Sequence, residues 1–204
     1  MKKNILYFFF FVFFLSSCCP SGKDNEYKKV ATALQQSVPY ASGQTVKFVG
    51  SDGNSYSLNV KRTLEETHSD FNKCSGQTLE FFNVELKNSE ATPLMRFGTN
   101  YTTDEQMTIE LLTKQFQGGA QYYLFQYFVN EDGSFQCGEK FNFIYTCHES
   151  IEIAGKTYFD VLEINQKELD PNGENNVLRL FYSQNKGVIQ YEFENGVIYS
   201  MTES

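Results

Sequence analysis

The chain has 204 residues and a formal net charge of −8, from 25 acidic and 17 basic residues. This length suffices for one domain with a hydrophobic core, and an acidic chain without a basic patch lacks the charge footprint of a nucleic-acid-binding protein. The 20 Phe and 13 Tyr residues are expected mainly in the core, although an aromatic sheet face can also line a pocket for a sugar or a lipid.

The first 17 residues have the three parts of a secretory signal. Lys2 and Lys3 form a basic start, residues 5–15 are apolar, and small residues lead to Cys18. The apolar run is too short to span ~30 Å of hydrocarbon as a mature helix. We therefore predict that residues 1–17 are removed, which takes away two lysines and shifts the net charge from −8 to −10.

Leu15-Ser16-Ser17-Cys18 resembles the lipobox of bacterial lipoproteins. The resemblance implies that Cys18 carries the lipid and that signal peptidase II cuts just before it. In the enterobacterial scheme Asp after the lipidated cysteine retains a lipoprotein in the inner membrane, and Cys19 here favours the outer membrane instead. Exposure on the periplasmic face or on the cell surface stays open. The alternatives are an uncleaved core strand or an ordinary signal followed by a chance cysteine.

Residues 18–38 are predicted to be a tether that contains a short helix. The stretch begins with Pro, Gly and charged residues without periodicity, which is typical of a flexible spacer. Asp24 and Asn25 are candidate N-caps, and the helix is expected to end before Pro39. Four apolar side chains have helical spacing: Tyr27, Val30, Ala31 and Leu34. The alternative is a partly ordered linker.

From Tyr40 onward, alternating patterns and turn residues predict strands joined by hairpins. The expected strands lie at residues 45–49, 56–60, 78–86, 121–129, 141–147, 151–164 (two strands around Ala154-Gly155), 177–182, 188–193 and 197–201. Asn195-Gly196 is expected to form a hairpin turn in which both residues have positive φ. Residues 103–116 fit a capped helix and a strand equally well, and we predict a strand because the neighbouring segments are strands.

About ten strands with hairpin-length connections, and no βαβ spacing, predict an all-β and mainly antiparallel fold. Residues 39–204 should form a single domain, either a β-sandwich or an open, curled barrel. "PYASGQTVKFVGSDGNSYSLNV", "YFDVLEI" and "LFYSQNKGVIQYEFENGVIYSM" are similar to hairpins of small lipoproteins from Bacteroidetes-type bacteria. The resemblance implies the location and the fold, because these motifs are turn and core patterns rather than chemistry.

Catalytic and metal-binding motifs are scarce. The chain has two histidines, His68 and His148, which are too few for a metal site built mainly from histidine ligands. Cys147 and His148 are adjacent on an expected strand, so their side chains should point to opposite faces and cannot act as a catalytic pair. Two acidic pairs could in principle act as in a glycosidase: Glu65 with Glu66, and Asp160 with Glu163. Their spacing also fits solvated surface, and we predict no enzyme, no cofactor and no metal site.

Two loops and three cysteines complete the candidates. Residues 51–55 and 170–176 are rich in Asp, Asn and Gly, and we interpret both as turns, although the second has alternating oxygen ligands as calcium loops do.

An exported chain meets oxidising conditions, which favours a disulfide. We predict a bond between Cys74 and Cys137, because Cys147 lies on the apolar side of its strand and should point inward. A Cys137–Cys147 bond is the competing choice.

These observations leave two functions. The first is a lipid-anchored, non-catalytic interaction or structural module of the outer membrane that holds a protein or polysaccharide partner. The second is a carrier that encloses an acyl chain or lipid inside a curled sheet. The inner face of the sheet discriminates between them, since a carrier needs a dry cavity and a module fills the same space with Phe and Tyr.

Overall fold

The computed structural model describes residues 26–72, 75–88, 93–99, 106–116, 119–169 and 176–202. The secondary structure within these ranges is β1 Glu26–Lys28, α2 Thr32–Gln36, β2 Thr45–Gly50, β3 Ser55–Asn72, β4 Ser75–Lys87, β5 Pro93–Thr99, β6 Gln106–Phe116, β7 Gly119–Phe128, β8 Gly138–Lys140, β9 Phe143–Ile153, β10 Lys156–Gln166, β11 Val177–Ser183, β12 Gly187–Phe193 and β13 Ile198–Thr202. The predicted all-β class is therefore confirmed.

The strands form one sheet in the order β7-β6-β5-β4-β3-β2-β13-β12-β11-β10-β9-β8. Neighbours along this path with a described register are antiparallel, as predicted, and β1 pairs with β4 in parallel. The chain divides into a smaller unit, residues 1–29 and 66–80, and a larger unit, residues 30–65 and 81–204. Each unit is described by itself below.

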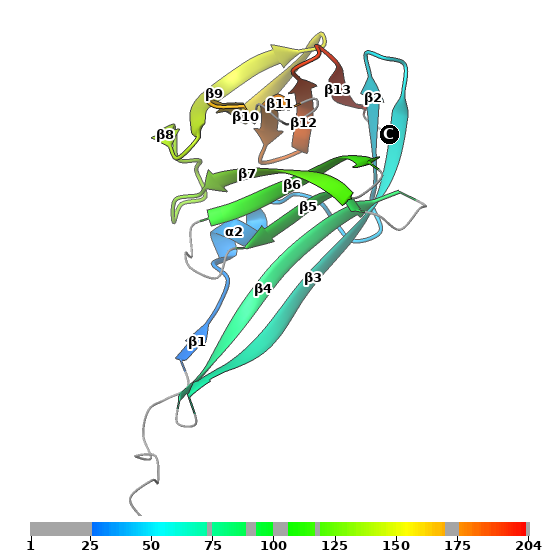
Figure 1. Ribbon diagram of the computed structural model, residues 1–204. Coiled ribbons are helices and arrows are strands. Elements are labelled where there is room, and N and C mark those ends of the chain that lie inside the picture. Colours follow the sequence, from blue (N-terminus) through cyan, green and yellow to red (C-terminus); the bar gives the residue numbers. More distant parts are fainter. Residues whose placement is uncertain are drawn as a thin grey trace, which may run out of the picture. The chain divides into compact units, whose positions relative to one another are not determined.

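In the larger unit the sheet is open and curled, and β5, β6 and β7 face the layer of β9 to β13 (Figure 1). Rings from the two layers meet in one core, with centroids 5.7 Å apart for Phe125 and Phe143 and 5.1 Å apart for Tyr127 and Tyr182. The two end strands of the sheet, β7 and β8, are consecutive in the chain. The connection between them folds back on itself through an isolated bridge of Val129, the residue after β7, with Phe135.

Alternation along the strands explains this core. Phe82, Val84 and Leu86 are all buried on one face of β4, as predicted from their spacing. In β6, Met107 and Ile109 are also buried at alternate positions. The strand predicted within residues 103–116 is therefore confirmed over Gln106–Phe116, and the helical alternative is wrong there.

The helix is shorter than the sequence pattern indicates. It covers Thr32–Gln36, and Ala31 occupies the N-cap position without a side-chain hydrogen bond. Leu34 is buried as expected, but Tyr27 lies in β1 and not on a helix face. Asp24 and Asn25, the expected caps, lie outside the described residues and well before the first helical turn.

Contacts within the smaller unit explain why Tyr27 is extended. Its backbone pairs with Thr78 of β4, and its hydroxyl lies 2.7 Å from a carboxylate oxygen of both Glu66 and Glu80. The hydrogen bond with Glu80 is the main cause that raises the pKa of Tyr27, and Glu66 adds to it. Long-range pairing thus outweighs the local helical spacing at this residue.

The turns confirm the hairpins and correct one detail. Of Asn195 and Gly196, only Gly196 has a positive φ, of 81°. The Asn195 side chain accepts a hydrogen bond from the Val197 amide at 3.0 Å, which holds the turn without a left-handed Asn. Two consecutive positive φ values occur instead at Ala154 and Gly155, 51° and 76°.

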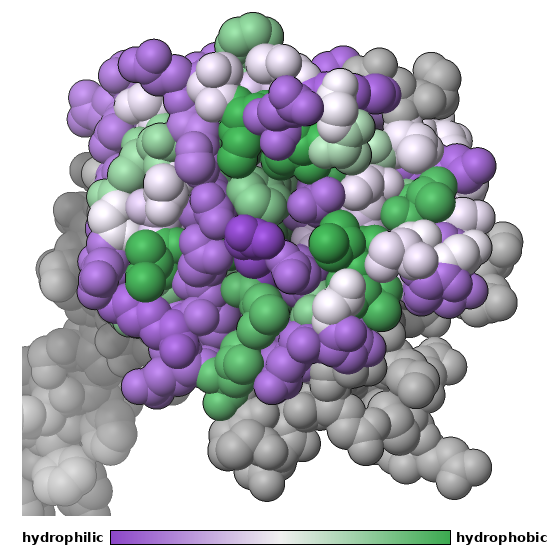
Figure 2. All heavy atoms as spheres, turned by 90° about the horizontal axis from the view of Figure 1, so that it is seen from above, coloured by the Kyte–Doolittle hydropathy of each residue, from purple (hydrophilic) through white to green (hydrophobic). Residues whose placement is uncertain are grey.

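The surface is chemically mixed. On the face seen from above, apolar side chains form separate patches between polar ones (Figure 2). The most exposed large apolar side chains among the described residues are Phe141 at 76% and Phe159 at 62%. Phe141 also has a φ of 52°, which is strained for a bulky residue.

Candidate functional site

The interior of the curled sheet holds a buried tyrosine cluster. Tyr127 and Tyr182 lie with their hydroxyl oxygens 3.5 Å apart, and both reach the end of the helix at Ser37. The Tyr182 hydroxyl donates to the Ser37 carbonyl at 2.5 Å, and the Tyr127 oxygen is 2.9 Å from Ser37 Oγ. Tyr40 accepts a hydrogen bond from the Val188 amide at 2.8 Å. All three tyrosines are less than 2% exposed, so rings and a helix end fill this space.

The helix end is also held by a cation. The Arg62 guanidinium donates to the carbonyls of Gln35 and Val38 at 2.8 Å each, which satisfies oxygens that a helix C-terminus leaves without partners. Its central carbon lies 4.5 Å from the Phe82 ring centroid, which adds a cation–π contact. Burial lowers the pKa of Arg62, yet an arginine remains charged.

Burial raises the pKa of Tyr40, Tyr127 and Tyr182 above the ordinary tyrosine value. Desolvation is the largest cause in each case, because a phenolate would have to sit in an apolar core. These hydroxyls therefore stay neutral at physiological pH. Their geometry suits structural hydrogen bonds rather than acid–base chemistry.

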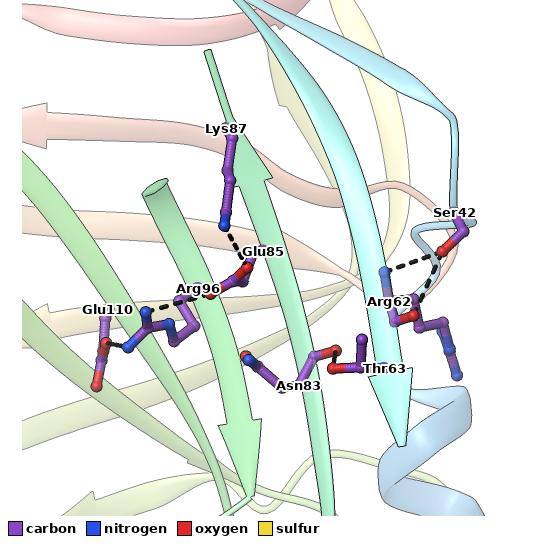
Figure 3. Close-up of polar contacts among 8 residues, drawn as sticks. All are labelled: Ser42, Arg62, Thr63, Asn83, Glu85, Lys87, Arg96 and Glu110. Carbon is purple, nitrogen blue, oxygen red and sulfur yellow. Dashed lines mark hydrogen bonds and ion pairs between the residues drawn. The ribbon is translucent and has the colours of Figure 1, made fainter. Parts of the chain in front are cut away.

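On the outer face of the larger unit, charged side chains form a row across three strands. We call Glu85, Lys87, Arg96 and Glu110 the ionic ladder (Figure 3). Arg96 lies between two carboxylates, with Nη2 3.2 Å from Glu85 and Nη1 3.3 Å from Glu110. Lys87 Nζ is 2.7 Å from the other oxygen of Glu85. The register places Arg96 directly opposite both acids, which explains the row.

Glu85 is the centre of the ladder's electrostatics. The hydrogen bond from Lys87 is the largest cause that lowers the pKa of Glu85, and the charge of Arg96 adds to it against the cost of burial. The Glu85 side chain is only 15% exposed, whereas that of Arg96 is 40% exposed. The ladder therefore combines a largely buried carboxylate with two cationic partners, Glu85, and a guanidinium that is more accessible to solvent, Arg96.

The row beside the ladder contains a glycine with open space above it. Gly98 of β5 pairs with Asn83 of β4 and with Thr108 of β6, and Thr108 pairs with Gln126 of β7. An added Cβ at Gly98 would meet no atom within 4 Å. Asn83 Oδ1 and Arg96 Nε have less than 1 Å² of exposed surface and no hydrogen-bond partner in the described part of the chain.

A second polar cluster lies on β9 to β12. His148 Nε2 is 2.8 Å from Glu163, and Arg179 binds Glu192 while its Nη1 lies 3.7 Å from Glu163. Burial alone would raise the pKa of Glu163, but contacts with His148, Asn165 and Arg179 outweigh it and lower that pKa. An ionised Glu163 held by three polar or charged partners, His148, Asn165 and Arg179, suits a structural role.

The other residues singled out in the sequence have ordinary surroundings. Asp160 is exposed with a φ of 52°, Glu65 is exposed, and Glu66 contacts Tyr27. Residues 51–55 form the predicted turn, in which Asp52 accepts a hydrogen bond from the Asn54 amide at 3.0 Å. Residues 170–175 lie outside the described residues, as does the side chain of His68.

The predicted Cys74–Cys137 disulfide is wrong, because Cys137 is bonded to Cys147 with 5.8 Å between the Cα atoms. Cys147 is exposed rather than buried. The β8–β9 hairpin pairs Lys140 with Phe143, so the chain turns at residues 141–142 and brings the two cysteines close. Recognising that hairpin would have favoured this bond. Cys18, Cys19 and Cys74 lie outside the described residues.

Metal-binding clusters and membrane-spanning helices are both absent from the described residues. In the described ranges, no group of three or more His, Cys, Asp or Glu side chains is placed to hold a metal ion. No helix among those same residues is long and apolar enough to cross a membrane. Comparison with family models, curated proteins and solved structures finds no match to this chain.

Proposed function

We propose that the chain is a lipoprotein of the outer membrane, anchored by a lipid on Cys18, that serves as a non-catalytic interaction module. The basic start, the short apolar run and the lipobox-like residues 15–18 support the anchor. A domain that binds its partner without chemistry needs a stable framework and an accessible surface. The hydrogen-bonded tyrosines in the interior and the charged side chains on the outer face of β4 to β6 are consistent with both requirements.

The observation that carries this proposal is the tyrosine cluster. A carrier must enclose an acyl chain in an apolar cavity of several hundred Å³. Here the hydroxyls of Tyr127 and Tyr182 converge on Ser37 at the end of the helix, and both rings are buried in the core. Displacing these groups would leave buried hydroxyls and carbonyls without partners, which costs about 1–3 kcal/mol for each group. The arrangement therefore favours a module over a carrier.

Native mass spectrometry of the full-length protein, purified in detergent from its membrane, tests the module. We expect one mass that corresponds to the processed chain with its covalent lipid. A second, dissociable lipid or fatty acid in most molecules would favour the carrier instead. The variant Cys18→Ala tests the anchor, and we expect it to lose detergent-phase partitioning. A variant that partitions like the wild type would contradict the lipobox interpretation.

A further inference from the structure

The strand β7 ends the sheet on one side, and most of its outer edge is unpaired among the described residues. Near the end of β7 the Phe128 carbonyl accepts a hydrogen bond from the Gln136 amide at 2.9 Å, so the backbone groups of Phe128 point away from β6. Backbone groups alternate in direction along an antiparallel strand, and those of Gln126 and Leu124 therefore also point away from β6. No described residue bonds to them on that side. We call residues 119–126 the free edge.

The composition of β7 leaves this edge unprotected. Natural sheets usually protect an edge with charged side chains, prolines, bulges or a very short strand. Gly119–Phe128 has ten residues with no charge and no proline, and the register shift of its pairing lies in β6. By contrast, β8 at the other end of the sheet has three residues, which include Glu139 and Lys140. The part of β9 beyond its pairing with β8 carries Glu149 and Glu152.

An exposed apolar side chain lies in the middle of the free edge. Leu124 is 50% exposed on the outer face, whereas its neighbours Tyr123 and Phe125 are buried on the inner face. A strand added to β7 with an apolar side chain opposite Leu124 would remove both side chains from water. The free edge therefore favours a partner strand that is apolar at this point and uncharged along its length.

β7 itself meets this description, so a second copy of the chain is a suitable partner. Two copies with a net charge of −8 repel each other, and their contact is least opposed where neither carries a charge. A two-fold axis at Leu124 places this residue opposite its counterpart and Gln126 opposite Tyr122 of the second copy. Residues whose backbone groups point outward then face one another, as an antiparallel hydrogen-bonded ladder requires. Both copies use the same edge, which closes the assembly as a dimer.

We propose that the chain forms a two-fold symmetric dimer by antiparallel pairing of β7 with β7 of a second copy. The dimer goes beyond the proposed function and does not require the lipid on Cys18. A contact along one strand edge is small, and small interfaces are weak. We expect a dissociation constant on the order of 10 μM, so the protein is largely dimeric at about 0.1 mM and largely monomeric at about 1 μM.

Sedimentation equilibrium of the full-length lipidated protein in density-matched detergent tests the dimer. We expect the protein mass to rise from one chain at about 1 μM to nearly two chains at about 0.1 mM. The same masses at two detergent concentrations are expected, since the chains do not merely share a micelle. One chain at every concentration, assemblies larger than a dimer, masses that follow the detergent, or a different protein in place of the second copy would each overturn the proposal.

The variant Leu124→Lys places a charge at the centre of the free edge. Two lysines would lie directly opposite each other and the apolar contact would be lost, so we expect the dissociation constant to rise at least about tenfold. Ser57→Lys, at an exposed position of β3, is the matched control because it changes the net charge equally. A less negative chain repels itself less, so the control should associate at least as well as the wild type. An unchanged dissociation constant for Leu124→Lys would refute the pairing.

The variant Gln126→Pro tests the backbone contacts of the free edge. The Gln126 amide points away from β6, so proline deletes a hydrogen bond of the dimer and none between β7 and β6. We expect a far-ultraviolet circular dichroism spectrum like that of the wild type and a single-chain mass at about 0.1 mM. A variant that keeps this spectrum and remains dimeric would contradict the proposed ladder.

The variant Leu124→Cys supplies a test that does not depend on weakening the dimer. Residues opposite each other in a hydrogen-bonded pair lie about 5.5 Å apart, which a disulfide can span. Oxidation should give a cross-linked dimer on a non-reducing gel, whereas Ser57→Cys should match the background of the wild type. Equal cross-linking of the two variants would reject the axis at Leu124. These outcomes are independent of the tests on Cys18 and on retained lipid, so the dimer can fail while the lipid-anchored module stands.

Discussion

Replacing Arg62 with methionine should destabilise the larger unit strongly. The guanidinium donates two hydrogen bonds of 2.8 Å, to Gln35 and Val38, and a longer one of 3.3 Å to Tyr40. A hydrogen bond from a charged donor contributes about 1.5–3 kcal/mol. We take the low end for the two short bonds, because the group is partly exposed, and neglect the third. With about 0.5 kcal/mol for the contact with Phe82, the expected loss is about 3.5 kcal/mol.

Urea unfolding followed by tyrosine emission can measure this loss, since the chain has no tryptophan. With a typical slope of about 2 kcal/mol per molar urea, the midpoint should fall by almost 2 M. Arg62→Lys is the matched control, because it keeps the charge and can reach one carbonyl; it should lose about half as much. A midpoint shift below about 0.5 M for Arg62→Met would refute the role assigned to this side chain.

Three further predictions concern the surface of the larger unit. Phe141→Asn should leave the stability unchanged or raise it by up to about 1 kcal/mol, because asparagine tolerates the left-handed φ. A stability loss of more than about 1 kcal/mol in thermal unfolding would contradict the strain assigned to Phe141. The pKa of Glu85 is lowered in the folded state. Its contribution to the free energy of unfolding is therefore fully present above the pKa of an unfolded glutamate, about 4.3, and is lost as the pH falls through the lower pKa of the folded state. Glu85→Gln should therefore flatten the fall of stability on acidification, whereas Glu149→Gln, at an exposed position of β9, serves as the control; equal slopes for the two variants would reject this. Opening the Cys137–Cys147 bond with two serines should cost about 3 kcal/mol by the chain-entropy model, and non-reducing peptide mapping should recover the bonded pair from the wild type.

Alternation alone sufficed to predict most of the sheet. Phe82, Val84 and Leu86 are buried where period-two spacing puts them, and residues 45–49 with 56–60 form the expected hairpin. β5 was not predicted, because Pro93 and Gly98 interrupt its strand signal. Its place between β4 and β6 comes from long-range pairing that a local pattern does not contain.

The site residues were harder to predict, because they come together only through register. Glu85, Arg96 and Glu110 belong to three strands and meet since each pair lies directly opposite in the sheet. The helix prediction failed at Tyr27 for a related reason, as its partners Glu66 and Glu80 are 39 and 53 residues away. The disulfide was assigned wrongly because the expected strand began at Phe141 rather than after the turn.

The contacts of the helix end also bear on how the larger unit folds. Ser37 bonds to Tyr182 and Tyr40 bonds to Val188, across separations of 145 and 148 residues. Such distant contacts are slow to form, since a long loop must close before they contribute. The segment that is synthesised early thus waits for β11 and β12, which are synthesised late. Until those strands emerge, Ser37 and Tyr40 lack these two partners. The Phe- and Tyr-rich strands made earlier are exposed during this time and can associate wrongly with one another.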